Sequence, residues 1–467
     1  MMVDTHCHIQ FPEFDADREA VLERAGAADV QVLISAGIDV ESSRRAVEFA
    51  EKHDGVYALV AVHPNELEYA AEDWPQRIRE LARHPKVKGI GETGMDLYRQ
   101  RTEPDVQRRA LAVHLEIARD AGLPVAMHSR AAGREVLDVV EGFAGGKPVR
   151  GIMHCFTDKE SVMTRAVAAG LHVSFAGPLT YPISRKNREL MKNVPDSRIL
   201  IETDAPYLGA QPVKHRRNEP SYLRYIAAKV AEMRRISPRD ASRITTLNAD
   251  DIFGLGVADR RPKVAYGIRS MLYLNITNRC NGRCSFCPRT AAVDGGEASS
   301  AGYYVKGHNL LLDREPTAEE VMDAMGVIEP YREIVFCGLG EPTLRLEVLL
   351  GIARWVRAQG QRVRLDTNGL GSLQHGRSIV PELKDAVDAV SVSLNAPSAE
   401  EYVRLCQPEA GAAAFQAVVD FIREAHDLIP DVTLTAVELP GLDVRTMKKL
   451  ARDLGVQYHG RKAGMLG

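Results

Sequence analysis

The chain has 467 residues, of which 45% are hydrophobic and 26% charged, an ordinary globular composition that is too long for one ordinary domain. A formal net charge of −3 excludes a global basic field for polyanions, and no apolar run approaches the ~18 residues of a membrane span. Seven cysteines, three of them at 280, 284 and 287, indicate metal ligands in a reducing compartment rather than disulfides. We therefore expect a cytoplasmic protein that has no membrane segment.

The first half alternates short apolar runs with longer segments of helical period. About eight such units in roughly 250 residues favour an α/β fold in the form of a parallel (βα)₈ TIM barrel. Amphipathic segments at 42–53 and 105–121 fit the intervening helices. The runs expected to form strands are 30–35, 56–62, 87–91, 124–127, 151–153, 172–175 and 198–201.

Candidate metal ligands follow the predicted strands, at the end where the active site of such a barrel lies. Because strand side chains alternate, His6 and His8 share one face. Six nitrogen and oxygen ligands exceed what one tetrahedral ion needs, which favours two divalent cations that share Glu92 or Asp204. The predicted metal set is His6, His8, Glu92, His128, His154 and Asp204.

Other side chains near these positions have predicted supporting roles. Two ions roughly 3.5–4 Å apart can activate water and stabilise a leaving oxygen, with Glu92 and Asp204 as catalytic residues. We expect Asp204 to accept the proton of the water and Glu202 to support the ligands from behind. His63 either binds a substrate oxyanion or is structural. Zinc, manganese, magnesium and iron all suit a site of histidine and carboxylate.

Two further features of this half are a basic run that is either functional or structural, and two cysteines. A nucleic-acid contact would need a local basic patch, such as the run 214–217, with Lys214 and Arg216 as candidates for substrate binding. The same run could equally be a solvated turn. Cys7 and Cys155 point away from the ligand face by strand alternation, so we expect them to be small packed residues.

Several motifs in residues 1–255 occur in the order and spacing of a known family. They are Val3-Asp4-Thr5-His6-Cys7-His8, Gly91-Glu92-Thr93-Gly94-Met95-Asp96, His128-Ser129-Arg130, His154-Cys155-Phe156 and Glu202-Thr203-Asp204-Ala205-Pro206. This half resembles the TatD family of metal-dependent hydrolases, which implies a TIM barrel with 3′→5′ exonuclease or DNase activity and the metal set given above. Asn65, Ala131 and the 211–217 loop depart from the family pattern around the expected substrate mouth and leave the metal set intact.

The second half, 270–467, follows a predicted linker at 256–269. A strand at 270–276 leads into Cys280-x3-Cys284-x2-Cys287. Three thiolates on a tight loop can hold three corners of a cubane iron–sulfur cluster and leave one iron open. A zinc site would need a further ligand, and the next histidine is the distant His308. A closed electron-transfer cluster would need Cys337 or Cys406.

The cysteine spacing, with Phe286 before the last cysteine, resembles the radical S-adenosylmethionine signature. A predicted strand at 333–336 ends in Cys337-Gly338-Leu339-Gly340-Glu341-Pro342, which resembles the segment of that superfamily that binds the methionine amino group. The resemblance implies a 4Fe–4S cluster, S-adenosylmethionine, a 5′-deoxyadenosyl radical and an electron donor. The predicted S-adenosylmethionine contacts are Gly340, Glu341, Thr367, Asn368, Ser393 and Asn395, of which the last four could instead be turn formers.

Residues from about 265 to 467 resemble the small radical proteins associated with TatD hydrolases, and about 200 residues can close only a partial (βα)₆ barrel. We expect 295–307 to be an insertion in this pattern. The leading hypothesis is a bifunctional enzyme that acts on DNA or another phosphodiester and, through a radical, on an unidentified substrate. Two alternatives stay open: a small-molecule hydrolase acting on an amide or lactone, or one catalytically silent half that regulates the other.

Overall fold

The computed structural model describes residues 1–287, 289 and 304–462. The chain divides into two compact units, Met1–Ala258 and Asp259–Gly467. Each unit has its own hydrophobic core. Within the described residues, no helix combines the length and apolar character needed to cross a membrane.

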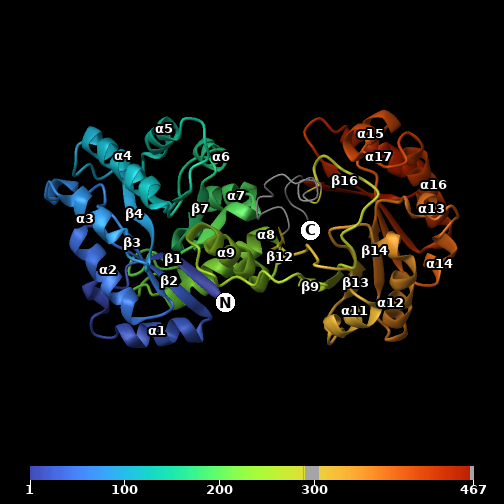
Figure 1. Cartoon of the computed structure of the whole chain (residues 1–467), viewed down its shortest axis with the longest axis horizontal. Helices are drawn as coiled ribbons and strands as arrows, with labels where there is room; N and C mark the ends of the chain where they lie inside the picture. Colours follow the sequence, from blue (N-terminus) through green and yellow to red (C-terminus); the bar gives the residue numbers. More distant parts are fainter. Residues whose placement is uncertain (288, 290–303, 463–467) are drawn as a thin grey trace. The chain divides into compact units, whose positions relative to one another are not determined.

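The first unit is built on eight parallel strands that follow one another in chain order (Figure 1). Backbone hydrogen bonds from Asp204 N to His6 O (2.9 Å) and from His8 N to Ala205 O (2.7 Å) join the end of the first strand to the segment that follows the last strand. The predicted TIM barrel is confirmed. Its strands are β1 Met2–Cys7, β2 Val30–Ala36, β3 Val56–Val60, β4 Val87–Asp96, β5 Val125–Arg130, β6 Gly151–Met153, β7 His172–Phe175 and β8 Ile199–Ile201.

Amphipathic helices alternate with these strands and cover the barrel. In α2, a capping box between Asp39 and Ser42 satisfies the first backbone amides, and Ala46, Val47 and Ala50 form the buried stripe. The α-helices of this unit are α1 Arg18–Ala27, α2 Val40–Lys52, α3 Trp74–Leu81, α4 Pro104–Ala121, α5 Gly133–Ala144, α6 Glu160–Ala168, α7 Arg185–Asn193, α8 Leu223–Arg234 and α9 Pro238–Phe253.

The second unit contains a seven-stranded sheet in the order β17-β16-β15-β14-β13-β10-β9. Six strands are parallel, which confirms the partial (βα)₆ barrel, and β9 is antiparallel to β10. Two further strands, β11 Tyr304–Val305 and β12 His308–Asn309, pair with each other. The strands of the sheet are β9 Ala265–Ile268, β10 Met271–Leu274, β13 Glu333–Phe336, β14 Val363–Thr367, β15 Ala389–Ser393, β16 Asp431–Glu438 and β17 Gln457–Lys462.

Helices cover one face of this second sheet (Figure 1). Leu365, Val392 and Leu434 pack on that face, whereas the alternate positions Arg364 and Ser391 point to the other face because strand side chains alternate. The α-helices are α11 Ala318–Met325, α12 Leu346–Ala358, α13 Gly371–Gln374, α14 Val380–Lys384, α15 Ala399–Cys406, α16 Ala413–Leu428 and α17 Val444–Asp453.

Some boundaries differ from those predicted. The segment predicted as a linker, 256–269, contains strand β9, because Tyr266 and Ile268 alternate with less buried neighbours and fall on the buried side. Strand β4 runs on to Asp96, so Glu92 lies inside it rather than after it. Of the predicted insertion at 295–307, residues 295–303 lie outside the described residues, and 304–307 belong to the β11–β12 hairpin.

Candidate functional site

Glu92 is the centre of the candidate metal site in the barrel. Its side chain is buried among histidines, with the whole residue 5% exposed. Glu92 Oε2 lies 3.4 Å from His6 Nε2 and 3.8 Å from His8 Nε2. Asp204 Oδ1 faces the same two imidazoles, 3.9 Å from His6 Nε2 and 3.5 Å from His8 Nε2. Four of the predicted ligands therefore surround one position.

The other oxygen of Glu92 faces a second set of imidazoles. Glu92 Oε1 lies 2.7 Å from His128 Nδ1 and 3.3 Å from His154 Nε2. His63 Nε2 is also close, at 3.5 Å, although its sequence position suggested a substrate contact rather than a ligand. One carboxylate thus separates two histidine-lined positions, which is the arrangement of a bridging ligand between two cations.

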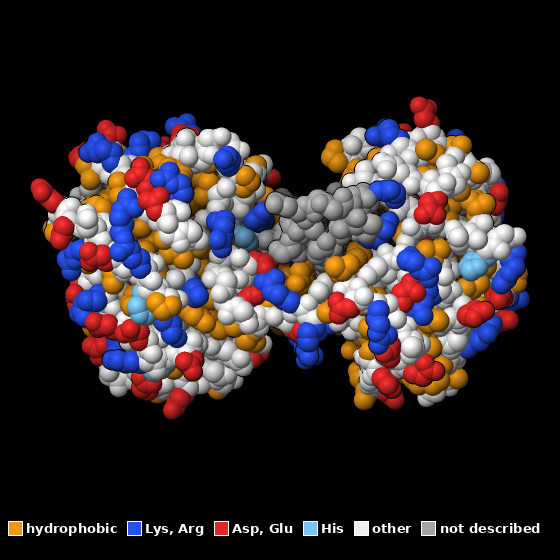
Figure 2. Space-filling model, in the orientation of Figure 1, with side chains coloured by type: hydrophobic (Ala, Val, Ile, Leu, Met, Phe, Trp, Pro, Cys, Tyr) orange, Lys and Arg blue, Asp and Glu red, His pale blue; other side chains and the backbone are white. Residues whose placement is uncertain are grey.

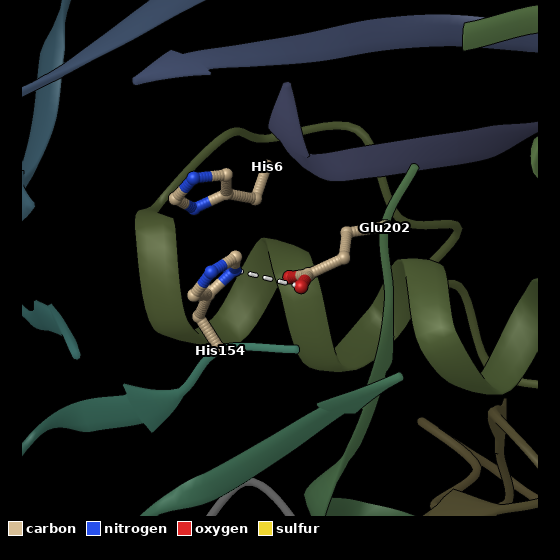
Figure 3. A group of neighbouring side chains, drawn as sticks. All are labelled: His6, His154 and Glu202. Carbon is tan, nitrogen blue, oxygen red and sulfur yellow. Dashed lines mark ion pairs between the residues drawn. The ribbon is translucent and has the colours of Figure 1, made fainter. Parts of the chain in front are cut away.

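Hydrogen bonds behind the site orient the rings. His8 Nδ1 donates to Ala36 O at 2.7 Å, which directs its Nε2 toward the carboxylates. Glu202 Oε1 lies 2.8 Å from His154 Nδ1 (Figure 3) and also accepts from Cys155 N at 2.7 Å. The rings of His6 and His154 stack with their centroids 3.9 Å apart. Glu202 therefore contacts His154 from behind the candidate site.

The residues present fit divalent cations. In the described part of the chain, the buried His6 Nδ1 and Nε2 have no hydrogen-bond partner, and buried polar atoms in native proteins nearly always have one. Three groups bring ligand atoms within 4.8 Å of one another: His6, His8 and Glu92; His63, Glu92 and His128; and His6, His154 and Glu202. Burial opposes ionisation of Glu92, but the facing imidazoles, His154 foremost, hold its pKa well below the usual range. The carboxylate is therefore available as an anionic ligand.

A pocket of about 830 Å³ opens onto these side chains. Arg99, Arg101 and Arg130 contribute to its wall. Lys214 and Arg216 are not among the described residues that line it, and the Lys214 ammonium instead lies 4.8 Å from the centroid of the Tyr181 ring. The positive charge beside the candidate metal site thus comes from the loop after β4 and from the end of β5, and the sequence predicted none of these three arginines as a substrate contact.

Two neighbouring positions refine the predictions for the mouth of the site. Cys155 lines the pocket rather than packing away from it, because it follows the last residues of β6 with a left-handed backbone (φ 44°) and strand alternation no longer applies. Asn65, one of the departures from the family pattern, donates from Nδ2 to Asp96 Oδ2 at 2.8 Å. Its side chain therefore holds a carboxylate that lies 3.6 Å from His128 Nε2.

In the second unit, Cys280, Cys284 and Cys287 lie on the loop that follows β10, and each is partly exposed. The loop is tethered to the end of α15 by hydrogen bonds from Arg283 N to Cys406 O (3.0 Å) and from Ser285 N to Leu405 O (2.9 Å). Three thiols on one short loop are the donor set that fits an iron–sulfur cluster with three protein ligands.

Gly340 and Glu341 lie directly beside this loop. Gly340 N donates to Thr277 O at 3.1 Å and Glu341 N to Arg279 O at 2.8 Å. A Cβ at Gly340 would be 2.3 Å from Arg279 O, so only glycine permits this approach. The buried Glu341 carboxylate accepts from Thr367 Oγ1 (2.7 Å) and Asn368 N (2.8 Å).

The remaining predicted contacts divide into two groups. Asn368 Nδ2 reaches the loop, 2.7 Å from Asn281 Oδ1 and 3.8 Å from Cys280 Sγ. Ser393 and Asn395 instead bind neighbouring strands: Ser393 Oγ accepts from Arg461 at 2.9 Å, and Asn395 Oδ1 accepts from Val437 N at 3.0 Å.

One cysteine outside the motif lies against the loop. Hydrogen bonding to the Cys406 thiol, together with burial, raises the pKa of Cys284. Cys406 is buried at the carboxyl end of α15. Of the two cysteines considered for a closed cluster, Cys406 therefore adjoins a motif cysteine.

The first unit has the fold and the buried histidine–carboxylate site of a metal-dependent hydrolase built on a TIM barrel. Residues 3–254 match the family model of TatD related DNase, and the chain belongs to this family. Residues 274–454 match the model of the Radical SAM superfamily. The chain is thus an enzyme that joins a TatD-type hydrolase to a radical SAM domain.

Similar proteins match the first unit over nearly their whole length. An uncharacterized metal-dependent hydrolase, YabD of Bacillus subtilis, is 36% identical over 253 residues, which cover 54% of this chain and 99% of that protein. A 3′-5′ ssDNA/RNA exonuclease TatD of Musicola paradisiaca is 34% identical over 263 residues, covering 55% and 98%. The crystal structure of YJJV, a TatD homolog from Escherichia coli, matches with a TM-score of 0.52 and 28% identity, covering 54% and 98%.

Proposed function

We propose that residues 1–255 form a binuclear-metal phosphodiesterase of the 3′→5′ exonuclease or DNase type. We further propose that residues 270–467, together with strand β9 in the preceding segment 256–269, form a radical S-adenosylmethionine enzyme with a 4Fe–4S cluster. The first proposal depends on one observation. The two oxygens of Glu92 face separate sets of imidazoles, His6 with His8 on one side and His128 with His154 on the other.

His6, His8, Glu92 and Asp204 would hold one ion, and Glu92, His128 and His154 the second. When bound, two divalent ions supply Lewis acidity that activates water and neutralises a leaving oxygen. Zinc, manganese, magnesium and iron all suit these donors. Glu202 keeps the His154 ring in position from behind through its 2.8 Å contact with Nδ1.

Asp204 is the proposed proton acceptor. Burial opposes ionisation of Asp204, but the hydrogen bond to His8 and the charges of the neighbouring imidazoles lower its pKa. The carboxylate is therefore charged at neutral pH and able to accept a proton. Its left-handed backbone (φ 57°) and the bond from its amide to His6 O fix the side chain over the site.

The pocket wall favours a phosphodiester over a neutral small molecule. Arg99, Arg101 and Arg130 supply guanidinium groups near the metal ligands, and guanidinium groups pair with phosphate oxygens in bidentate geometry. An exonuclease name on a relative that is 34% identical supports the same substrate class. A single strand of nucleic acid is therefore the proposed substrate.

In the second unit, Cys280, Cys284 and Cys287 would hold the cluster. A 4Fe–4S cluster with one open iron supplies, once an electron donor has reduced it, the electron that cleaves S-adenosylmethionine to a 5′-deoxyadenosyl radical. Gly340 brings the backbone close to the loop, and Glu341, with Thr367 and Asn368, presents a buried carboxylate for the methionine ammonium. Ser393 and Asn395 complete the proposed contact set.

The hydrolytic proposal is tested with a 5′-labelled single-stranded oligonucleotide and each divalent metal in turn. The full chain should shorten the strand from its 3′ end, and the double variant His6→Ala/His8→Ala should not. His84→Ala is the matched control, because His84 is partly exposed and pairs with Glu51 outside the site. Cleavage of amides or lactones without cleavage of any phosphodiester would identify a small-molecule hydrolase instead.

The radical proposal is tested by anaerobic reconstitution with iron and sulfide, followed by reduction with dithionite in the presence of S-adenosylmethionine. The full chain should release 5′-deoxyadenosine, and Cys284→Ala should not. Cys155→Ala, in the other unit, is the control and should retain release. If the reconstituted chain binds no iron or releases no 5′-deoxyadenosine, the second unit is a silent module.

A further inference from the structure

A cavity of about 580 Å³ opens at the amino ends of the strands of the second sheet. The cluster loop follows the carboxyl end of β10, so this cavity lies at the opposite end of the strands. Such a volume is typical of small-molecule pockets, which span roughly 300–1,000 Å³. The lining residues are Arg269, Ser270, Met271, Arg332, Glu333, Arg362, Arg364, Ala389, Val390, Ser391, Asp431 and Thr433.

Arginine dominates the charge of this lining. The lining holds four guanidinium groups but only two carboxylates, Glu333 and Asp431, so positive groups are in excess. Arg362 pairs with both carboxylates. Its Nε lies 2.9 Å from Glu333 Oε1, and one of its terminal nitrogens lies 2.6 Å from Asp431 Oδ2. The acids therefore position Arg362 and leave an excess of positive charge.

Arg364 occupies the inner part of the cavity wall. Its Nε is buried, lies 3.1 Å from Glu333 Oε2 and yet forms no hydrogen bond with any described residue. One of its terminal nitrogens is 3.5 Å from Asp366 Oδ1, beyond a normal hydrogen bond. Arg364 is thus ion-paired with Glu333, but its buried Nε lacks an aligned acceptor, and a bound acceptor in line with that N–H would supply the missing hydrogen bond.

We propose that this cavity binds a small phosphate monoester. A phosphate monoester carries about −1.5 to −2 charges at neutral pH, so it is attracted to a lining in which guanidinium groups outnumber carboxylates. The described lining contains arginine and no lysine, and the planar guanidinium pairs with phosphate oxygens in bidentate fashion. Ser270, Ser391 and Thr433 add hydroxyl donors, and Met271 and Val390 offer an apolar surface to the rest of the ligand.

The excess of positive charge is confined to this cavity. Figure 2 shows acidic and basic side chains interspersed over the visible face of each unit, in keeping with the small net charge. Along β14 (Val363–Thr367), Arg364 and the proposed S-adenosylmethionine contact Asn368 are four residues apart, about 13 Å at the usual strand rise. The phosphate site is therefore separate from the radical site, and S-adenosylmethionine does not compete for it.

The test is calorimetric titration of the full chain with ribose 5-phosphate and with inorganic phosphate, in a chelating buffer that keeps the barrel site free of metal. Ribose 5-phosphate should bind at one saturable site, and its affinity should be unchanged by added S-adenosylmethionine. Arg364→Gln should weaken binding by roughly tenfold or more, the usual effect of losing a charge-assisted hydrogen bond. Arg332→Gln, on the exposed rim, should weaken it in the same direction without threatening the fold.

Arg423→Gln is the matched control, because Arg423 is an exposed arginine on α16 paired with Asp420, and it should bind as the native chain does. Absence of saturable binding would overturn the proposal, as would equal weakening in Arg423→Gln. Loss of binding in His6→Ala/His8→Ala would place the ligand in the barrel instead. Succinate binding as tightly as ribose 5-phosphate would overturn the assignment to phosphate.

Discussion

The two units place their candidate sites at the same end of a parallel sheet but build them differently. In the barrel, ligands from or just after β1, β4, β5, β6 and β8 converge on the buried Glu92. In the second unit, the three thiols belong to one partly exposed loop after β10. The barrel site is therefore a property of the closed sheet, whereas the cluster site depends on what holds one loop in place.

The difference predicts where each site is vulnerable. Barrel ligands are fixed by the strands and by orienting contacts such as Glu202 with His154, so exchange of one ligand should alter chemistry more than fold. The cluster loop is held by backbone bonds to Cys406 O and Leu405 O and by the close approach of Gly340. A change in its backbone surroundings should disturb the site even when every thiol remains.

The largest effect should come from Glu92→Gln. The facing imidazoles hold the pKa of Glu92 low, so the change removes an anion that faces both proposed cation positions. Hydrolysis should fall by about 10³-fold or more, the scale of losing a central electrostatic group, and metal content by mass spectrometry should fall below two ions per chain. The melting temperature should change little, because the strands remain in place.

Glu66→Gln provides the matched control for that experiment. Glu66 lines the same pocket but belongs to none of the candidate ligand groups among the described residues. Its metal content should equal that of the native chain. Full metal occupancy in Glu92→Gln would show that the carboxylate does not bridge, and the barrel would then hold its ions without the arrangement proposed here.

A smaller effect, on the other side of the comparison, is expected from Gly340→Ala. The added Cβ would lie 2.3 Å from Arg279 O and 2.5 Å from Thr277 O, so the cluster loop must move. Release of 5′-deoxyadenosine should fall roughly 10²-fold, as for a misplacement of about 1 Å, and unfolding should cost about 1–3 kcal/mol less. Both are measured on the reconstituted chain.

Gly351→Ala tests whether that effect is local. Gly351 lies in α12 with no described atom within 4 Å of an added Cβ, so alanine should stabilise the helix by about 0.5–1 kcal/mol and leave radical chemistry unchanged. Equal activity in the two alanine variants would mean that the loop does not rely on Gly340, and the contrast between the units would disappear.

The limits of a strand could be predicted from the sequence where the strand is a short apolar run, and less well where polar residues interrupt it. The runs 151–153 and 172–175 coincide with β6 and β7, because short buried strands have sharp apolar limits. Strand β4 continues for five residues beyond its predicted end, through Glu92 and Asp96, since ligand residues that face the barrel interior interrupt the apolar pattern. Strand β9 offers only Tyr266 and Ile268 as buried residues and resembles a connector.

The candidate site shows the same limit. The histidines and acids could be predicted as a group because each lies in the second half of a strand or just after it, and parallel strands bring those ends together. Arg99 and Arg101 line the pocket from a loop. The path of a loop cannot be predicted from the spacing of apolar residues. The charge run at Lys214 and Arg216 was the stronger sequence signal, yet those side chains lie outside that lining. Charge clustering along a chain does not determine which cations surround a pocket.

The smallest effect is expected from Cys406→Ser, which tests whether the cluster loop holds its site with three thiols. Cys406 hydrogen-bonds to Cys284, and serine retains a donor and acceptor at that position. Iron and sulfide content should stay at the native value, and release of 5′-deoxyadenosine should change by no more than the few-fold expected from one altered hydrogen bond. A loss of iron as large as in Cys284→Ala would make Cys406 a fourth ligand. The cluster would then be closed to S-adenosylmethionine, and the second unit would carry electrons rather than generate a radical.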